Sequence, residues 1–358
     1  MSARHVLVGH VLVVRLDNDG DVLLTGPAIR AVAAGADRVT LLCGPRGRRA
    51  SELLPGVDHI VEYRAGWIDP DPVAVDRSRT LALVDRLATL GVEQAVVFTS
   101  FHQSALPTAL LLRLAGVPVI AAVSDDYPGS LLDVRHRVGE DVHEVERALS
   151  LVATLGYRLP PGDSGRLAVI RPAAGEPNPA GLGQYVAVHP GASVPARAWA
   201  PERHALLVDA LVAAGWRVAV TGGPAEAALT ARVAGPRRPG VVDLGGRTSL
   251  AQLAEVLAGA DAVVAGNTGP AHLAAAVGTP VVSLFAPTVT PSRWRPWGVP
   301  HLLLGAHDMA CAGCRASHCP IPGHPCLGRV EPAEVVGALQ ALLADRDRTY
   351  PPTVTVLR

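Results

Sequence analysis

The sequence contains no lysine, so all 32 residues counted as Lys or Arg are arginine. Any side-chain cation that binds a phosphate group must therefore be Arg or His, with backbone N–H groups at a helix start as the other choice. Aromatic residues make up only 4% of the chain, whereas hydrophobic residues make up 49%. A core built from Ala, Val and Leu is typical of buried parallel strands flanked by helices.

The chain also lacks an excess of charge and a long apolar run. Its formal net charge is +0, so the composition predicts no nucleic-acid partner. No run approaches the ~18–20 apolar residues of a membrane span, and the N-terminus lacks the small-residue cleavage site of a signal peptide. We therefore predict a soluble, cytoplasmic protein, whose contact with the inner face of a membrane would be peripheral.

Short β-branched runs alternate with helical patterns in the first part of the chain. This alternation predicts a parallel sheet with helices on both faces. A polar stretch follows, and its second half has the pattern of a long helix. The predicted strands cover 11–16, 38–43, 59–64, 95–100 and 117–123, and the predicted helices cover 22–34, 79–90 and 104–114.

A Pro- and Gly-rich stretch, 159–184, then interrupts both patterns. The alternation restarts with predicted strands at 185–190, 217–223, 241–246, 262–267 and 281–287 and predicted helices at 201–214, 225–234, 249–259, 270–277 and 332–344. We predict an N-terminal domain over 1–160, a linker over 161–184, a C-terminal domain over 185–345 and a tail over 346–358. Two such Rossmann-like α/β domains form a cleft, and ligands bind at the carboxyl ends of their parallel strands.

Asp21 follows the first predicted strand, in the segment RLDNDGDVLLTGPAIRA. Gly20 permits a tight turn before it, and a helix starts nearby. One interpretation is that Asp21 caps this helix. The other is that its carboxylate faces the cleft and takes a proton from an incoming hydroxyl group. Asp17 and Asp19 are nearby alternatives to Asp21, although turns are the preferred interpretation of both.

Two loops of the second predicted domain suit an anion or a sugar. Ser193 and Arg197 follow its first strand, in HPGASVPARAWAPERHALL, where backbone N–H groups and these side chains suit a phosphate group. An ordinary strand–helix loop with a solvated Arg is the alternative. Glu226 follows the next strand, and its carboxylate suits either a ribose diol or the dipole of the helix that begins there.

A third loop, residues 266–269 (GNTG), joins a buried strand to a helix that begins at Pro270 and carries His272. The backbone N–H groups at this helix start and the Thr268 hydroxyl suit a diphosphate. His272 is either part of this site or a buried structural histidine. In combination, one domain offers anion and sugar contacts and the other a carboxylate, which is the division of labour that a nucleotide-sugar transferase needs.

These segments occur in the order and spacing of glycosyltransferase family 9, the ADP-heptose–lipopolysaccharide heptosyltransferases, which the chain resembles over nearly its whole length. The combination of GDV at 20–22 with NTGPAHLAAAVGTP at 267–280 is quite specific to that family. The resemblance implies the GT-B fold, in which two Rossmann-like domains with parallel sheets face each other across a cleft. It also implies transfer of a heptose or related sugar from a nucleotide-diphosphate sugar, ADP-heptose or similar, to a glycan or glycolipid acceptor.

The resemblance assigns roles to single residues. The family's proposed catalytic base falls on Asp21. Its phosphate-binding basic residue falls on Arg197, with the Ser193 hydroxyl beside it, and its nucleoside-binding glutamate falls on Glu226. Its pyrophosphate-binding loop falls on Asn267, Thr268, Gly269 and His272.

Two of these positions depart from the family's pattern. Arg197 replaces the Lys of the best-known members, which keeps the charge but alters its geometry. Asn267 replaces a frequent Asp, which puts any role for a negative charge there in doubt.

We expect displacement with inversion at the anomeric carbon, with no metal or other cofactor required for catalysis. A sugar-nucleotide epimerase of the same fold and a catalytically inactive nucleotide-sugar-binding protein stay open.

Four of the five cysteines cluster in one loop, at Cys311, Cys314, Cys319 and Cys326. The initial CxxC suits a structural zinc ion, but the remaining spacing is not a standard zinc pattern, so zinc, two disulfides and free thiols all stay open. The resemblance implies that this loop is structural and remote from catalysis. Cys43 lies in a predicted strand and is expected to be buried.

Overall fold

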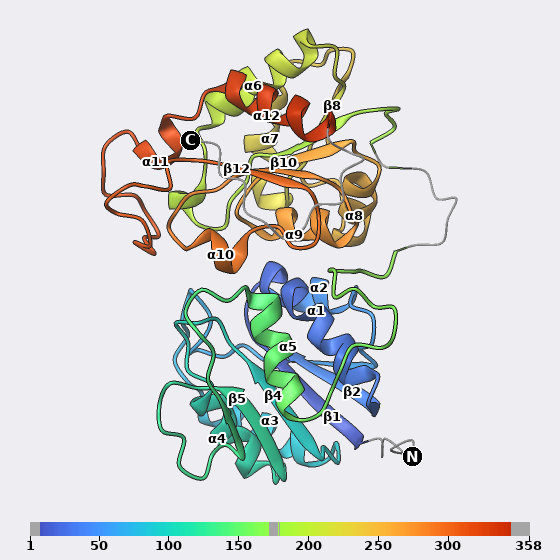
Figure 1. Cartoon of the computed structure of the whole chain (residues 1–358), viewed down its shortest axis with the longest axis vertical. Helices are drawn as coiled ribbons and strands as arrows, with labels where there is room; N and C mark the ends of the chain where they lie inside the picture. The colour runs from blue at the N-terminus through green and yellow to red at the C-terminus, as the bar shows by residue number, and fades with distance from the viewer. Residues whose placement is uncertain (1–7, 172–177, 179, 345–358) are drawn as a thin grey trace. The chain divides into compact units, whose positions relative to one another are not determined.

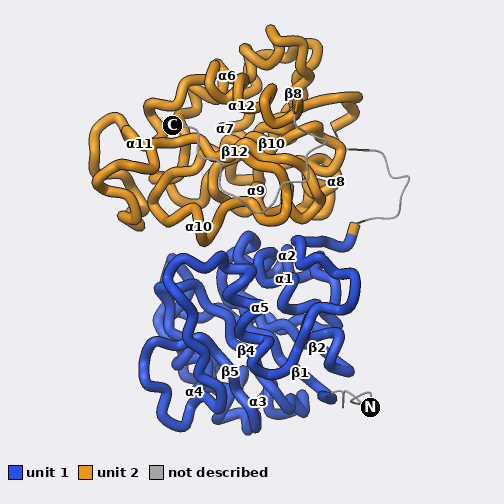
Figure 2. The backbone as a smooth tube through the Cα atoms, viewed as in Figure 1, with its two compact units in different colours: residues 1–170 blue, residues 171–358 orange. Residues whose placement is uncertain are grey.

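The computed structural model describes residues 8–171, 178 and 180–344. The chain divides into two compact units, residues 1–170 and 171–358 (Figure 2). The division falls within the stretch predicted as a linker, of which the central part lies outside the described residues, as does the predicted tail. Among the described residues, no helix is both long and apolar enough to cross a membrane.

The first described part of the predicted linker, residues 161–171, makes ordered contacts with both units. Residues 161–170 pack as part of unit 1, where the Arg30 guanidinium donates to both carboxylate oxygens of Asp163, at 2.7 and 2.9 Å. In unit 2, the Arg171 guanidinium makes the same paired contact with Glu255, at 2.7 and 2.8 Å. Each of these ion pairs has two parallel hydrogen bonds, which fixes its geometry.

Strands and helices alternate through most of unit 1 (Figure 1). Its elements are β1 (Val8–Arg15), α1 (Asp19–Ala33), β2 (Ala36–Cys43), α2 (Arg48–Ser51), β3 (His59–Glu62), α3 (Arg77–Ala88), β4 (Gln94–Phe98), α4 (Leu106–Leu114), β5 (Val119–Val123), β6 (Val134–His136) and α5 (Glu144–Thr154). The strands form a six-stranded parallel sheet in the order β3-β2-β1-β4-β5-β6.

The central strand β1 is covered on both faces, which explains why apolar and polar residues do not alternate along its middle. Leu12 and Val14 lie in a core cluster with side chains of α3 and α4 on one face of the sheet. Val11 and Val13 are also fully buried, on the opposite face. A strand covered on both faces needs apolar residues that point to both, and residues 11–14 (VLVV), between His10 and Arg15, supply them.

Unit 2 repeats the same arrangement with different residues. Its elements are β7 (Val186–His189), the 3₁₀ turn η1 (Pro195–Arg197), α6 (Pro201–Ala213), β8 (Val218–Val220), the 3₁₀ turn η2 (Pro224–Glu226), α7 (Ala227–Ala234), β9 (Val241–Asp243), α8 (Leu250–Ala258), β10 (Ala262–Gly266), α9 (Gly269–Ala276), β11 (Val281–Leu284), α10 (Pro291–Trp294), β12 (His301–Leu304), α11 (Pro325–Gly328) and α12 (Pro332–Ala344). Its six-stranded parallel sheet has the order β12-β11-β10-β7-β8-β9.

In both sheets the strand order changes direction between the first and the fourth strand of the unit. In unit 1 the first and fourth strands, β1 and β4, are neighbours, and in unit 2 the corresponding neighbours are β7 and β10. In open α/β sheets, ligands bind beyond the carboxyl ends of the strands at this switch point. The segments that follow these four strands are therefore where a site is expected.

The predicted alternation of strands and helices is confirmed, with differences at the sheet edges. The sequence analysis missed β6 and β12, the outermost strands of their sheets. β6 has three residues, none fully buried, so it carries no apolar run that would reveal it. Helix α1 begins three residues earlier than predicted, at Asp19. Cys43 is buried at the end of β2, as expected.

Candidate active site

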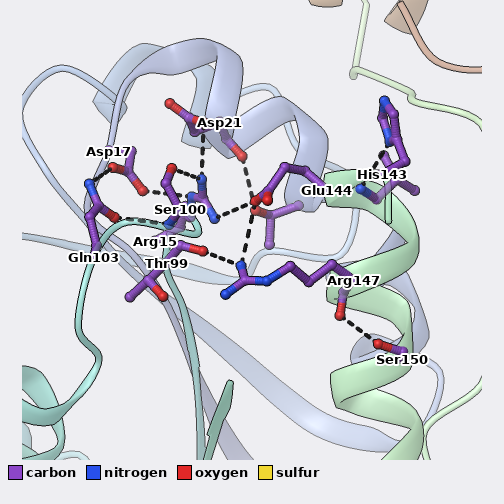
Figure 3. A network of polar contacts seen from close by, with 12 residues as sticks. Arg15, Asp17, Asp21, Thr99, Ser100, Gln103, His143, Glu144, Arg147 and Ser150 are labelled. Carbon is purple, nitrogen blue, oxygen red and sulfur yellow. Dashed lines mark hydrogen bonds and ion pairs between the residues drawn. The ribbon is translucent and has the colours of Figure 1, made fainter. Parts of the chain in front are cut away.

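A buried arginine, Arg15, ends β1 and gathers three carboxylates around its guanidinium group (Figure 3). Its Nε lies 2.8 Å from Asp17 Oδ2, and its Nη2 donates to Asp21 Oδ1 at 3.0 Å. Its Nη1 lies 3.6 Å from Glu144 Oε2. The side chain of Asp21 is 18% exposed, against 7% for Asp17 and 3% for Glu144. Asp21 is thus the carboxylate of the three that a reactant reaches most readily.

The loop after β4 fixes the other side of this network. Arg15 Nη2 also donates to Ser100 Oγ at 2.9 Å. Gln103 receives a hydrogen bond from Ser100 N at 2.9 Å and donates one to Asp17 Oδ1 at 2.5 Å. On α5, Arg147 donates to the carbonyl oxygen of Thr99. One connected polar network therefore lies at the switch point between β1 and β4. Arg15 at the end of β1 and the residues just after β4 both belong to it.

Asp17 lies at the bend between β1 and α1, but its carboxylate does more than turn the chain. Its carboxylate is buried, and burial raises its pKa from the usual 3.8 to about 6, although the positive charge of Arg15 acts in the opposite direction. Asp19 is also more than a turn residue, because its carboxylate accepts from Ala50 N and from Arg49, both at 3.1 Å. It thereby ties the start of α1 to α2.

Asp21 does not cap α1. The N-cap is Asn18, whose side chain makes no capping hydrogen bond, and Asp21 lies in the first turn of the helix. Its carboxylate is held by Arg15 at the carboxyl end of β1. A carboxylate that is fixed by a buried cation and partly exposed is suited to accept a proton from a bound hydroxyl group.

In unit 2, Arg197 lies beside the ends of β10 and β11. It ends η1, and its Nε donates to Thr288 Oγ1 at 3.2 Å. A Cβ on Gly266 would lie only 3.3 Å from the Arg197 carbonyl oxygen, so the chain approaches closely here. Residues that follow β7, β10 and β11 are therefore neighbours at one edge of the sheet. Ser193 lies in the same segment as Arg197 and is exposed.

The start of α9 offers buried polar atoms that the protein itself does not use. Thr268 is the N-cap of α9, and Gly269 is its first helical residue. Among the residues that the structure describes, neither Asn267 Oδ1 nor Thr268 Oγ1 has a hydrogen-bond partner, although both atoms are buried. Buried polar atoms without a partner are costly, so they indicate a ligand at this helix start. His272 is buried one turn further along α9.

Glu226 lies against the end of β7. Its Oε2 accepts from Gly223 N at 2.7 Å and lies 3.6 Å from His189 Nε2. A Cβ on Gly191 would lie 1.8 Å from Glu226 Oε1, so only glycine permits this approach. His189 Nδ1 lies 3.0 Å from Thr221 Oγ1, and burial lowers the pKa of His189. A neutral His189 is therefore favoured at neutral pH, and the carboxylate beside it, that of Glu226, is partly exposed.

The four clustered cysteines lie after β12, three in the segment between β12 and α11 and Cys326 within α11. Across residues 8–171, 178 and 180–344, no group of three or more His, Cys, Asp or Glu side chains is placed to hold a metal ion. All five cysteines are free thiols. Burial raises the pKa of Cys326, and the nearby Cys319 and Cys311 add to this effect. Cys326 is buried and Cys314 is exposed, so the four thiols differ in their surroundings.

Comparison with known sequences places this chain in a family. The sequence model described as "Glycosyltransferase family 9 (heptosyltransferase)" matches residues 98–324, well over half of the 358 residues. The chain belongs to glycosyltransferase family 9. The matched range contains Ser193, Arg197, Glu226 and residues 267–272, whereas Asp21 precedes it and Cys326 follows it.

Two curated relatives are similar to this family 9 chain over part of its length. Lipopolysaccharide heptosyltransferase 3 of Escherichia coli is 35% identical over 122 residues, 33% of this chain and 36% of that protein. Lipopolysaccharide heptosyltransferase 1 of Pseudomonas aeruginosa is 34% identical over 227 residues, 61% of each protein. The chain thus spans 36% and 61% of the length of these two curated relatives.

The solved structures share the fold over almost their whole length. The glycosyl transferase family 9 protein from Veillonella parvula has a TM-score of 0.74 at 16% identity, covering 96% of this chain and 99% of that one. The Escherichia coli heptosyltransferase WaaC with ADP-2-deoxy-2-fluoro heptose has a TM-score of 0.69 at 22% identity, covering 93% and 99%. The predicted α/β fold class, with the GT-B pair of Rossmann-like sheets, is confirmed.

The structure adds residues to the site that the sequence analysis did not single out. Arg15 was detectable as the one charged residue inside an apolar strand, and Thr288 as a hydroxyl residue just after β11. Glu144 and Gln103 gave no comparable signal, because their importance depends on contact with residues far away in the sequence. His189 ends β7 in the same way that Arg15 ends β1.

Proposed function

We propose that this protein is an inverting glycosyltransferase. It would transfer a heptose or related sugar from a nucleotide-diphosphate sugar to a hydroxyl group of a glycan or glycolipid acceptor. The observation that carries the proposal is the carboxylate of Asp21, held by Arg15 at the switch point of unit 1 in a chain of family 9. The relatives named above support it, since both are lipopolysaccharide heptosyltransferases.

The donor is assigned to unit 2. Asn267 Oδ1 and Thr268 Oγ1 are buried without partners at the start of α9, where backbone N–H groups favour an anion. Arg197 supplies a cation at the same sheet edge, and Ser193 a hydroxyl. The related WaaC structure holds ADP-2-deoxy-2-fluoro heptose, which supports an ADP-heptose-like donor here.

The chemistry follows from these assignments. Asp21 takes the proton of the acceptor hydroxyl, whose oxygen forms a bond to the anomeric carbon. The bond from that carbon to the diphosphate oxygen breaks on the opposite side, which inverts the configuration. Arg197 and the start of α9 stabilise the negative charge of the leaving diphosphate. Because protein groups supply this stabilisation, we expect transfer to persist in the presence of EDTA.

The remaining donor contacts complete the assignment. Glu226 is placed to accept hydrogen bonds from a ribose diol, with the neutral His189 behind it. Gly269 would contribute its backbone N–H to the diphosphate, and His272 would support this helix start from its buried position in α9. We place the enzyme in the cytoplasm, at the inner face of the membrane when its acceptor is a glycolipid.

Product analysis tests the proposal. The full-length protein is incubated with ADP-heptose and glycan or glycolipid acceptors, and the products are separated and identified by mass spectrometry and NMR. We expect release of ADP together with a glycosylated acceptor whose new anomeric bond is inverted. An altered sugar nucleotide without transfer would establish the epimerase instead. Nucleotide-sugar binding with no turnover on any acceptor would establish a binding protein.

A further inference from the structure

The segment that carries the four clustered cysteines, residues 306–326, forms a closed loop after β12 (the cysteine loop below). Its two ends meet where Ala306 N donates to the carbonyl oxygen of Cys326 at 2.9 Å. Cys326 is buried in the core of unit 2, whereas Cys314 and Ser317, in the middle of the loop, are exposed. The loop is thus anchored in the core at its base and extends outward from it.

The cysteine loop holds both backbone polar groups of Ala196, the residue before Arg197. Ala196 N donates to Ser317 O at 2.9 Å, and His324 Nε2 lies 3.0 Å from Ala196 O. A carbonyl oxygen only accepts hydrogen bonds, so the proton of His324 must be on Nε2. The backbone of η1 is therefore fixed on two sides by this loop.

The same loop also holds Thr288, whose hydroxyl group contacts the Arg197 side chain. Arg315 N donates to Thr288 O at 2.9 Å, and Gly313 N donates to Pro287 O at 2.7 Å. Thr288 is buried, and its hydroxyl accepts from Arg197 Nε at 3.2 Å. The loop therefore bonds to the residues on either side of the Arg197–Thr288 contact, which places it next to the donor site proposed above.

We propose that the cysteine loop positions Arg197 for the donor diphosphate. This inference rests on the proposed function, which gives Arg197 its phosphate. A long Arg side chain has much rotamer freedom, and an anion site gains affinity when that freedom is already restricted in the free protein. The loop provides the restriction, because it fixes both Ala196, which carries the backbone into Arg197, and Thr288, which holds the guanidinium.

His324 allows a test through a side chain, because the other loop contacts are made by backbone atoms. In full-length protein, His324→Ala is expected to weaken ADP binding ~3–10-fold, the range of one lost hydrogen bond, and to leave AMP binding nearly unchanged. His324→Gln is expected to restore most of the ADP affinity, because its Nε2 donates from a similar position. His324 has a positive φ of 46°, and both variants keep a side chain at this backbone conformation, so its energetic cost is common to both.

The matched control is His318→Ala, which removes an exposed histidine of the same loop that is not part of these hydrogen bonds. Binding of ADP and AMP is measured by titration calorimetry for each variant and for Arg197→Ala. In the Arg197→Ala background, His324→Ala is expected to change ADP affinity less than ~2-fold, because the residue it positions is gone.

The outcomes separate the two claims. If Arg197→Ala leaves ADP binding unchanged, the phosphate assignment and the loop proposal both fail. If Arg197→Ala weakens ADP binding but His324→Ala does not, only the loop proposal fails. Equal weakening of ADP and AMP by His324→Ala would also overturn it, because a general loss of structure affects both nucleotides.

Discussion

Arg15 Nη2 and Asp21 Oδ1 lie 3.0 Å apart, and only 4% of the Arg15 side chain is exposed. One oxygen of the proposed base is therefore committed to a buried cation. The charge of that cation is shared with Asp17 and Glu144, so Asp21 is held in place without being its only counter-ion. This arrangement fixes the direction of the carboxylate, which a base needs before its substrate arrives.

Replacing the proposed base tests its role directly. Asp21→Asn keeps the shape of the side chain but removes the proton acceptor, so kcat is expected to fall ~10²–10⁴-fold while the Kd of ADP stays nearly the same. The matched control is Asp19→Asn, a carboxylate of the same helical turn that binds Ala50 N. Steady-state kinetics and calorimetry measure both effects. A kcat for Asp21→Asn within a few-fold of wild type would limit Asp21 to a structural role.

The buried Asp17 predicts a pH dependence of stability. Its pKa in the folded protein is raised to about 6, so between about pH 4 and about pH 6 the folded state holds a proton that the unfolded state has released. The contribution of Asp17 to the free energy of unfolding therefore falls as pH rises through this window and is constant above it. The difference in stability between wild type and Asp17→Asn is expected to fall in the same way.

Urea unfolding of the full chain at several pH values measures this difference. The exposed Asp126 supplies the control variant, Asp126→Asn, whose stability relative to wild type is expected to change little across the window. A difference between wild type and Asp17→Asn that does not vary with pH would mean that Asp17 titrates alike in both states.

Arg197 is expected to carry much of the affinity for a diphosphate. A charge-assisted contact to phosphate contributes ~1.5–3 kcal/mol, so Arg197→Ala should weaken ADP binding ~10–150-fold. Arg197→Lys should recover part of this loss, since Lys keeps the charge but not the planar donor fork. AMP should be less sensitive than ADP. Arg232→Ala, which changes an exposed arginine of α7, is the control. Equal losses for AMP and ADP would contradict a contact with the distal phosphate.

The cysteine loop gives a prediction about metal content. Since the described residues form no metal-binding group and all five thiols are free, protein purified under reducing, chelator-free conditions is expected to carry no stoichiometric zinc or iron. Elemental analysis measures the metal, and thiol titration in denaturant should find every cysteine reactive. One equivalent of metal whose removal lowers the melting temperature would instead establish the metal interpretation.

Much of the site could be predicted because it lies at strand ends. Arg197, Glu226 and Thr268 each follow a strand that its own apolar residues reveal, and parallel strands bring their carboxyl ends to one edge of a sheet. The burial of Asp17 could not be predicted in this way. A short polar run after a strand suggests a turn, and only the contact with Arg15 shows that this carboxylate is buried.

The sequence by itself determined the alternation of strands and helices, the two sheets and the loops that carry the candidate residues, because periodicity and turn chemistry act over a few neighbouring residues. Only the tertiary structure decided which side chains meet. Glu144 reaches Arg15 because α5 packs against α1, and His324 reaches Ala196 because the cysteine loop folds back on η1. Such contacts depend on how whole elements pack, and no local pattern in the sequence encodes them.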